Sequence, residues 1–293
     1  MDKVSFQKAF ALASKLFDEN FVQVQRGLNN WVFEDSGRIL TIPRHERVKN
    51  YNIRVSATRK LLSAGVPVAD ILEHAPENEE RPEYLFVKKV EGSNVNLAEL
   101  SSSERESVHC SAGQVLKLIH SIREVEGYGR FDSSLIGKND SWLDFLDSFF
   151  EESLRRLDKN KTFWDKYANI LIKEYEKGKI LIEPFSNPSF LHADFHLGNL
   201  LFKNEKVVAV LDLDLVTSGD INWDTGHYCH TFNIDRERGI KSFRRGYGNS
   251  FNPEAERLYS LMIWIRKIGS QSIQRQYALK ETIPELERII RRN

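Results

Sequence analysis

The pattern of hydrophobic and polar residues is most informative between residues 190 and 214. Two apolar runs, at residues 200–202 and 207–211, are separated by four polar residues. Runs of this length on either side of a short polar segment predict a β-hairpin. Because a hairpin brings its two ends together, we expect the residues that flank it to be neighbours in space.

The residues that flank this hairpin carry oxygen atoms suited to phosphate chemistry. Asp194 and Asn199 precede the first run, and Asp212 follows the second. Together they offer a carboxylate base for an incoming hydroxyl and oxygen ligands for Mg²⁺, which is what phosphoryl transfer needs. The same stretch also allows a transition-metal site, as in a hydrolase. His192, Asp194 and His196 alternate, so they would share one face of an extended segment.

Helical and strand periodicities divide the N-terminal part of the chain into short elements. They predict helices over residues 5–18 and 46–64, and strands over 22–33, 38–42, 68–72 and 83–90. Gly65 and Pro67 form a stop signal for the second helix.

A glycine-containing turn interrupts the first of these strands. Gly27 and Asn29 break the alternation within residues 22–33. Kinases lay a strand, a glycine-containing turn and a second strand over the phosphates of a nucleotide. An ordinary hairpin fits these residues equally well, so Gly27 alone does not decide between the two.

Helical patterns dominate the C-terminal part of the chain, apart from the hairpin. Ser103 and Glu106 are expected to form a capping box at the start of the first helix. Further helices are predicted around residues 141–149, over 162–177 and from Pro253 onward. The aromatic residues of the helix at 141–149 are expected in the core rather than in the wall of a cleft.

Composition narrows the class of protein. The 293 residues include 42 basic and 42 acidic side chains, so no net field attracts nucleic acid or an anionic membrane. The chain has no apolar secretion segment and no run of about 18 apolar residues. Cys110 and Cys229 are too few for a disulfide framework and are expected to be buried thiols. We therefore expect a cytoplasmic protein without nucleic-acid or membrane partners.

The polar stretch around the hairpin resembles a known family. The sequences HADFHLGN at residues 192–199, LDLD at 211–214 and GD at 219–220 are similar to those of the aminoglycoside phosphotransferase family. The resemblance implies an α+β, protein-kinase-like fold with two lobes. A small antiparallel-sheet lobe over residues 1–90 would bind the nucleotide, and a mainly helical lobe over 91–293 would hold the catalytic and substrate-binding groups.

The resemblance also implies a role for each acidic residue near the hairpin. Asp194 corresponds to the catalytic base, and Asn199 and Asp212 correspond to the ligands of Mg²⁺. Asp214 falls where the family has an acidic or polar residue, either a second metal contact or a solvated side chain. Asp224 corresponds to a structural residue that ties down the loop carrying the base. ATP or GTP is the expected phosphoryl donor.

On the nucleotide side, the resemblance points to two further segments. Gly27 and Asn29 match a G-x-x-N turn that often covers the phosphates. Lys88 and Val90 lie in the segment whose backbone groups contact the base of the nucleotide in such enzymes.

The small lobe departs from the family pattern at one pair of charges. Thr41 stands where the family has a phosphate-binding lysine, and Arg54 and Val55 stand where its glutamate partner would be. Pro43 ends the strand and leaves Arg44 free to turn toward the nucleotide. We expect Arg44 to replace the lysine in part.

Together these features predict transfer of the γ-phosphoryl group of a nucleoside triphosphate to a hydroxyl of a small polar molecule. The resemblance suggests an aminoglycoside antibiotic, and hence antibiotic resistance, as the first acceptor to test. A sugar, an amino alcohol or a macrolide is an alternative acceptor. The missing lysine–glutamate pair also leaves open a pseudokinase that binds a nucleotide or another ligand without catalysis.

Overall fold

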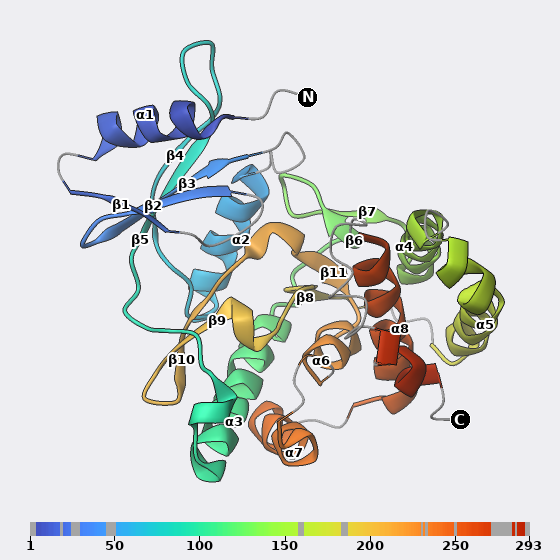
Figure 1. Cartoon of the computed structure of the whole chain (residues 1–293). Helices are drawn as coiled ribbons and strands as arrows, with labels where there is room; N and C mark the ends of the chain where they lie inside the picture. Colours follow the sequence, from blue (N-terminus) through green and yellow to red (C-terminus); the bar gives the residue numbers. More distant parts are fainter. Residues whose placement is uncertain are drawn as a thin grey trace.

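The computed structural model of the chain describes most of the sequence. The described residues are 4–17, 20–24, 30–44, 51–157, 161–182, 187–229, 231, 234–248, 251–270, 283–284 and 286–290. Figure 1 shows a sheet with two helices at one end of the molecule and a larger, mainly helical part at the other.

The first part is built around a five-stranded antiparallel sheet with the strand order β1-β2-β3-β5-β4. Its elements are α1 (Phe6–Leu16), β1 (Val22–Val24), β2 (Asn30–Glu34), β3 (Arg38–Pro43), α2 (Tyr51–Ser63), β4 (Ile71–Ala75) and β5 (Tyr84–Lys88). Leu40 and Ile42 of β3 pack with α1 on one face of the sheet. Ile39 and Thr41 alternate with them and face the opposite side, because successive strand residues point in opposite directions.

The helices and strands of this part agree with the sequence-based prediction, apart from one strand that is displaced along the chain. The predicted opening helix is confirmed as α1, with Ser5 as its N-cap. The helix predicted over 46–64 is described from Tyr51 to Ser63, while residues 45–50 lie outside the described part.

The strand predicted over 68–72 is displaced. Val68 pairs with Val210 of the distant hairpin, and the strand itself, β4, runs from Ile71 to Ala75 beside β5. The prediction was wrong at its N-terminal end because an apolar residue there serves a contact with the other part of the molecule.

The second part contains helices around a short sheet and the predicted hairpin. Its elements are α3 (Ser102–His120), β6 (Tyr128–Phe131), β7 (Gly137–Asn139), α4 (Trp142–Leu157), α5 (Lys161–Ile180), β8 (Ser189–Leu191), β9 (Leu200–Lys203), β10 (Lys206–Val210), β11 (Thr217–Gly219), α6 (Asn222–Cys229), α7 (Arg236–Tyr247) and α8 (Pro253–Ser270). Strands β7, β6, β11 and β8 form a four-stranded sheet in that order. Short 3₁₀ turns occupy Leu97–Glu99, Leu197–Asn199 and Leu213–Leu215.

Helix α3 begins two residues earlier than the sequence suggested. The capping box is formed by Ser101 and Glu104, so the predicted pairing of Ser103 with Glu106 was wrong. Three serines in a row, 101–103, offer competing caps, and the first of them is used. Farther along α3, Gly113 allows a close approach to α7, since a Cβ there would lie 2.1 Å from the carbonyl oxygen of Phe243.

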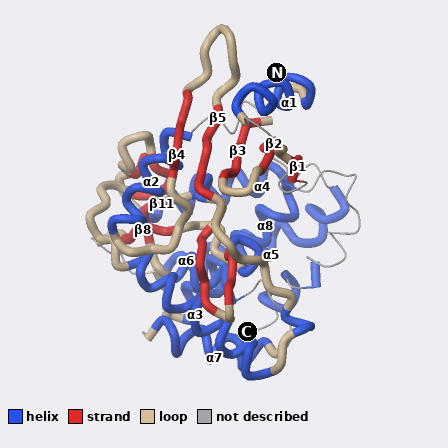
Figure 2. Tube along the Cα trace, turned by 90° about the vertical axis from the view of Figure 1, so that its left-hand side faces the viewer, coloured by secondary structure: helices blue, strands red, loops and turns tan. Residues whose placement is uncertain are grey.

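The β9–β10 hairpin is confirmed. Lys203 pairs with Lys206 across a two-residue turn in which Asn204 and Glu205 both have positive φ, as in a type I′ hairpin. The hairpin also contacts the chain that leaves the first sheet, because Ser93 and Phe202 exchange backbone hydrogen bonds. Figure 2 shows the five-stranded sheet above and the helices of the second part below.

None of the described helices combines the length and the apolar character needed to cross a bilayer.

Candidate active site

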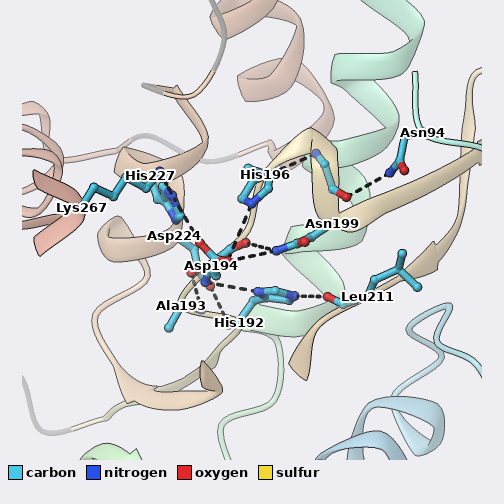
Figure 3. Close-up of polar contacts among 11 residues, drawn as sticks. Asn94, His192, Ala193, Asp194, His196, Asn199, Leu211, Asp224, His227 and Lys267 are labelled. Atoms are coloured by element: carbon cyan, nitrogen blue, oxygen red, sulfur yellow. Dashed lines mark hydrogen bonds and ion pairs between the residues drawn. The ribbon is translucent and has the colours of Figure 1, made fainter. Parts of the chain in front are cut away.

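The loop that follows β8 is held in place by a buried histidine. The side chain of His192 is fully buried, and its Nε2 donates a hydrogen bond to the Leu211 carbonyl oxygen at 2.9 Å. Its Nδ1 accepts a hydrogen bond from the backbone N–H of Asp194 at 3.2 Å. This neutral ring therefore connects the loop before the hairpin with the residue that precedes Asp212 (Figure 3).

Asp224, on α6, anchors the same loop from the other side. Its buried carboxylate accepts hydrogen bonds from the backbone N–H groups of His192 at 2.8 Å and Ala193 at 2.7 Å. His120 Nε2 donates a third hydrogen bond at 3.1 Å. Ala193 has a φ of +64°, a conformation that costs energy for a residue with a side chain. The hydrogen bonds to Asp224 stabilise that strained turn, which matches the structural role expected from the sequence.

The anchored loop presents Asp194 among polar partners. Asn199 Nδ2 donates hydrogen bonds to the Asp194 carbonyl oxygen at 2.9 Å and to Oδ2 at 3.1 Å. His196 Nε2 lies 3.7 Å from Oδ2, and His227 Nε2 lies 3.6 Å from Oδ1. Burial by itself raises the pKa of Asp194, but its interactions with His196, His227 and His192 outweigh that effect. The pKa is lowered, so Asp194 is an ionised carboxylate that can accept a proton.

Asn199 and Asp212 come together as the hairpin pattern predicted. The backbone N–H of Leu211 donates to the Asn199 carbonyl oxygen at 2.8 Å, which closes the base of the hairpin. Because Asn199 Nδ2 faces Asp194, its Oδ1 is the side-chain atom left to accept a ligand. Asp212 has a φ of +58° and an exposed side chain. Residues held in this strained region cluster at functional sites.

A cavity of about 360 Å³ lies between the first sheet and the hairpin; we call it the larger cavity. Asn199 and Asp212 line it, as do the predicted nucleotide contacts Lys88 and Val90. Its other lining residues are Val24, Asn30, Val32, Glu34, Ile39, Thr41, Arg54, Thr58, Val68, Ala69, Val87, Asn94, Gly198, Leu201, Val210, Leu211, Leu213 and Asp214. The remaining predicted contacts, Gly27 and Asn29, lie outside the described residues.

The arginine that lines this cavity is Arg54, whereas the sequence suggested Arg44. The Arg44 guanidinium stacks 3.8 Å from the centre of the Trp31 ring, and Arg44 does not appear among the described residues of the cavity wall. Arg54, on α2, does line the cavity, together with Thr41. Its charge acts on Asp214: burial raises the pKa of Asp214, and Arg54 opposes that shift.

A second cavity of about 150 Å³ lies on the other side of the loop at residues 192–199, which we call the catalytic loop after its expected role. We call this second cavity the smaller cavity. Asp194 and His227 line it. Its other lining residues are Arg130, Phe145, Phe149, Ala193, Leu215, Thr217, Trp223, Ile263, Arg266 and Lys267. Phe145 and Phe149 were expected in the core; they are buried there and also form part of this wall. Asp194 therefore faces one cavity while Asn199 and Asp212 face the other.

The hydrolase alternative is not supported by the geometry of the histidines. Both ring nitrogens of His192 are engaged in hydrogen bonds to the backbone, so neither lone pair is directed to a metal. His196 Nδ1 accepts a hydrogen bond from the backbone N–H of Gly198 at 3.0 Å. Within the described ranges, no group of three or more His, Cys, Asp or Glu side chains is arranged to hold a metal ion.

Comparison with known families agrees with this arrangement. The sequence profile of the phosphotransferase enzyme family (APH) matches residues 21–259, which include the first sheet, the catalytic loop and the hairpin. The chain belongs to this family.

Solved structures of phosphotransferases share the fold. The crystal structure of aminoglycoside phosphotransferase APH(4)-Ia has a TM-score of 0.75 and 17% sequence identity, with 98% of this chain and 99% of that chain covered. ADP-bound APH(2'')-Ib has a TM-score of 0.67 and 15% identity, with 98% and 97% covered. These similarities confirm the predicted two-lobed, kinase-like α+β fold.

One curated protein is also similar over part of its length. The chain is 28% identical over 184 residues to mouse acyl-CoA dehydrogenase family member 10. The match covers 58% of this chain and 16% of the mouse protein. The chain therefore corresponds to a small portion of that relative.

Several residues around this phosphotransferase site were not identified from the sequence. His227, Arg130, Arg266 and Lys267 come from β6, α6 and α8, far from the catalytic loop along the chain. No local motif connects them, and only the folded chain brings them to one cavity. Arg54 was noticed only as the residue at the place of an expected glutamate.

Proposed function

We propose that the protein is a Mg²⁺-dependent small-molecule O-phosphotransferase. It would move the γ-phosphoryl group of ATP or GTP to a hydroxyl group of an acceptor. The observation that carries the proposal is the position of the catalytic loop between two cavities. Asn199 joins them, because its Nδ2 binds the Asp194 carboxylate while the residue lines the larger cavity.

In this proposal the larger cavity binds the nucleotide. Residues 1–90 supply the sheet above it, with Gly27 and Asn29 covering the phosphates and Lys88 and Val90 next to the base. Residues 91–293 supply the catalytic loop and the acceptor site. The cavity has the concave and largely apolar walls that suit a nucleotide base.

The oxygen donors at the base of the larger cavity fit Mg²⁺. Asn199 offers an amide oxygen and Asp212 a carboxylate, the ligand types that a hard cation prefers. Asp214 lines the same cavity and adds a second carboxylate nearby. A bound Mg²⁺ would neutralise phosphate charge and so favour the loss of the nucleoside diphosphate.

Asp194 has the properties of the base that receives the acceptor proton. It lines the smaller cavity, and its lowered pKa keeps it ionised near neutral pH. During the reaction the acceptor oxygen forms a bond to the γ-phosphorus, and the bond from that phosphorus to the β–γ bridging oxygen breaks. The hydroxyl proton passes to Asp194 and then to solvent. Asn199 and His196 keep the carboxylate oriented toward the acceptor.

We assign to Arg54 the charge that the family places on a strand lysine. Thr41 is buried beside the larger cavity and carries no charge, whereas Arg54 reaches the same cavity from α2. The positive charge that the family carries on the strand is therefore carried by the helix in this chain: β3 has a neutral residue at this position, and α2 has a cation. Arg44, the candidate named from the sequence, remains the competing choice, and the two arginines are separated experimentally below.

Calorimetric titration of the purified chain with Mg²⁺-ATP and Mg²⁺-GTP tests the proposal, followed by measurement of nucleoside diphosphate release with a panel of alcohols. Metal-dependent binding and acceptor-dependent release are expected. Binding without release for any acceptor, in the parent chain, would favour the pseudokinase. Tightly held zinc that is lost from His196→Ala would favour the hydrolase.

A further inference from the structure

The smaller cavity is strongly basic for a site next to a catalytic carboxylate. Arg130 on β6 and Arg266 and Lys267 on α8 line it, while Asp194 is its acidic residue among the described side chains. Figure 1 shows β6, α4 and α8 side by side in this region, and α4 contacts both β6 and α8. The three cations thus converge from two elements on one small space.

These positive charges are only partly offset by nearby acids. The fields of Glu152 and Asp194 oppose the lowering of the Arg266 pKa, but Glu152 also forms an ion pair with Arg156. Within the described chain, neither Arg130 nor Arg266 has a carboxylate at ion-pair distance. Burial lowers the pKa of Arg266 to about 10, and the fields of Arg130 and Arg156 act in the same direction. Clustered cations that repel one another at a cavity wall favour an anionic ligand.

The rest of the wall is apolar and aromatic. Phe145, Phe149 and Trp223 pack against one another, with ring centroids 5.0 Å apart for Phe149 and Trp223. The Arg266 guanidinium lies 4.8 Å from the centre of the Phe149 ring, which fixes its charge at the edge of this apolar wall. A short carbon chain fits such a surface, with its charged end at the arginines.

A buried histidine, His227, forms part of the cavity wall. Lys267 Nζ lies 3.1 Å from His227 Nε2 and donates to it, so the proton of the neutral ring is on Nδ1. Burial lowers the pKa of His227 well below its ordinary value, with Lys267 acting in the same direction, which keeps the ring neutral. Nδ1 is buried and has no hydrogen-bond partner among the described residues.

We propose that the acceptor of this enzyme is a small hydroxy acid, whose carboxylate binds Arg130, Arg266 and Lys267 while its hydroxyl faces Asp194. This inference rests on the proposed phosphotransferase function and specifies its acceptor. The carboxylate lies at the basic wall, the carbon chain lies against the aromatic residues, and the hydroxyl oxygen attacks the γ-phosphorus with loss of its proton to Asp194. An aminoglycoside carries several protonated amino groups, and the same cations repel it.

The test compares acceptors that differ only in charge. The full-length protein is assayed with Mg²⁺-nucleotide and 3-hydroxybutyrate, its neutral amide, the matching amino alcohol, glycerol phosphate and a commercial aminoglycoside. The hydroxy acid is expected to have a kcat/KM about 10- to 100-fold above that of its amide, since hydrogen bonds to charged groups are worth this factor. Equal or higher kcat/KM for the amide, amino alcohol or aminoglycoside overturns the inference. Preference for glycerol phosphate overturns the choice of a carboxylate.

Two arginines on neighbouring elements provide matched variants. Arg266→Gln is expected to raise the KM for the hydroxy acid about 10-fold and to leave the KM for the nucleotide unchanged. Arg156→Gln removes a nearby cation that is paired with Glu152 and does not line the cavity, so both constants should stay at parent values. A rise in the nucleotide KM of Arg266→Gln would assign this cation to the phosphates instead. Thermal melting of each variant identifies those that fail to fold.

A binding measurement separates this inference from the proposed function. If no acceptor supports nucleotide consumption, thermal shifts with 3-hydroxybutyrate and with its amide still report on the cavity. A shift with the acid that is absent with the amide, and absent in Arg266→Gln, supports the anionic site even if catalysis fails. Equal shifts with both compounds, or no shift with either, contradict it.

Discussion

The two cavities on either side of the catalytic loop differ most in the charges that line them. The larger cavity mixes three carboxylates with the cations Arg54 and Lys88; the carboxylates are those of Glu34, Asp212 and Asp214. The smaller cavity has Asp194 opposite three cations. Mixed charge suits a nucleotide that arrives with a metal ion, whereas excess positive charge suits an anion without one. In the proposed function each reactant therefore has its own side of the loop.

The same loop serves both sides because its anchors are buried and its reactive groups are not. His192 and Asp224 hold the backbone from within the core. Asp194 and Asn199 are half-buried and face opposite cavities while remaining hydrogen-bonded to each other. This hydrogen bond links the proposed base to the proposed nucleotide side of the loop.

The largest effect is expected at the residue between the cavities. Asp194→Asn removes the proton acceptor and should lower kcat at least about 100-fold, the lower end of general-base contributions. Nucleotide affinity, measured by calorimetry, should stay close to that of the parent because the larger cavity is intact. A variant with near-normal turnover would exclude Asp194 as the base.

A somewhat smaller effect is expected for the metal-binding side. Asp212→Ala should weaken Mg²⁺-dependent nucleotide binding by about 100-fold, because even indirect metal partners contribute 10- to 100-fold. Binding of the hydroxy acid to the smaller cavity, followed by thermal shift, should not change. Loss of both binding events would indicate that the variant is misfolded rather than deprived of a ligand.

The sequence predicted the loop and hairpin at residues 192–212 better than it predicted the residues of the smaller cavity. Asp194, Asn199, Asp212 and the hairpin that joins them lie within about twenty residues, so local periodicity and turn chemistry were enough to predict that they are neighbours. The basic cavity depends on Arg130 and Arg266, which are separated by most of the second part of the chain. Their proximity follows from the packing of α4 against both β6 and α8, and tertiary packing leaves no signature in a local pattern.

The errors in the fold have similar causes. The strand expected from Val68 begins instead at Ile71, because Val68 bonds across to Val210. The capping box was predicted two residues too late, because three consecutive serines can each serve as the N-cap. Short-range rules identified the correct element in both cases, and contacts or competing residues decided its boundary.

A moderate effect distinguishes the two arginines near the larger cavity. Arg54→Ala should raise the dissociation constant for Mg²⁺-nucleotide about 10-fold, the loss of one charged hydrogen bond to phosphate. Arg44→Ala should leave it unchanged, because that guanidinium stacks on Trp31. Calorimetry on both variants decides the matter. The reverse result would assign the missing lysine's role to Arg44.

The smallest effect concerns pH. Because the pKa of Asp194 is lowered, its proton is absent at every pH above the ordinary aspartate value of 3.8. The kcat/KM profile should therefore show no loss due to this base from neutral pH down to about pH 5. The corresponding contribution to the free energy of unfolding is present above the unfolded pKa and is lost as pH falls through the folded one. In His196→Ala, which removes a contact that lowers this pKa, the acidic limb should move to higher pH.

The division of the reactants between the two cavities is the central claim, and it is tested most directly by measuring both Michaelis constants in Arg54→Ala and Arg266→Gln. The account predicts that Arg54→Ala raises the KM for the nucleotide about 10-fold and leaves the KM for the hydroxy acid within about 2-fold. Arg266→Gln should show the opposite pattern. If either variant changes the two constants equally, or if the patterns are exchanged, the two reactants do not occupy the cavities as described.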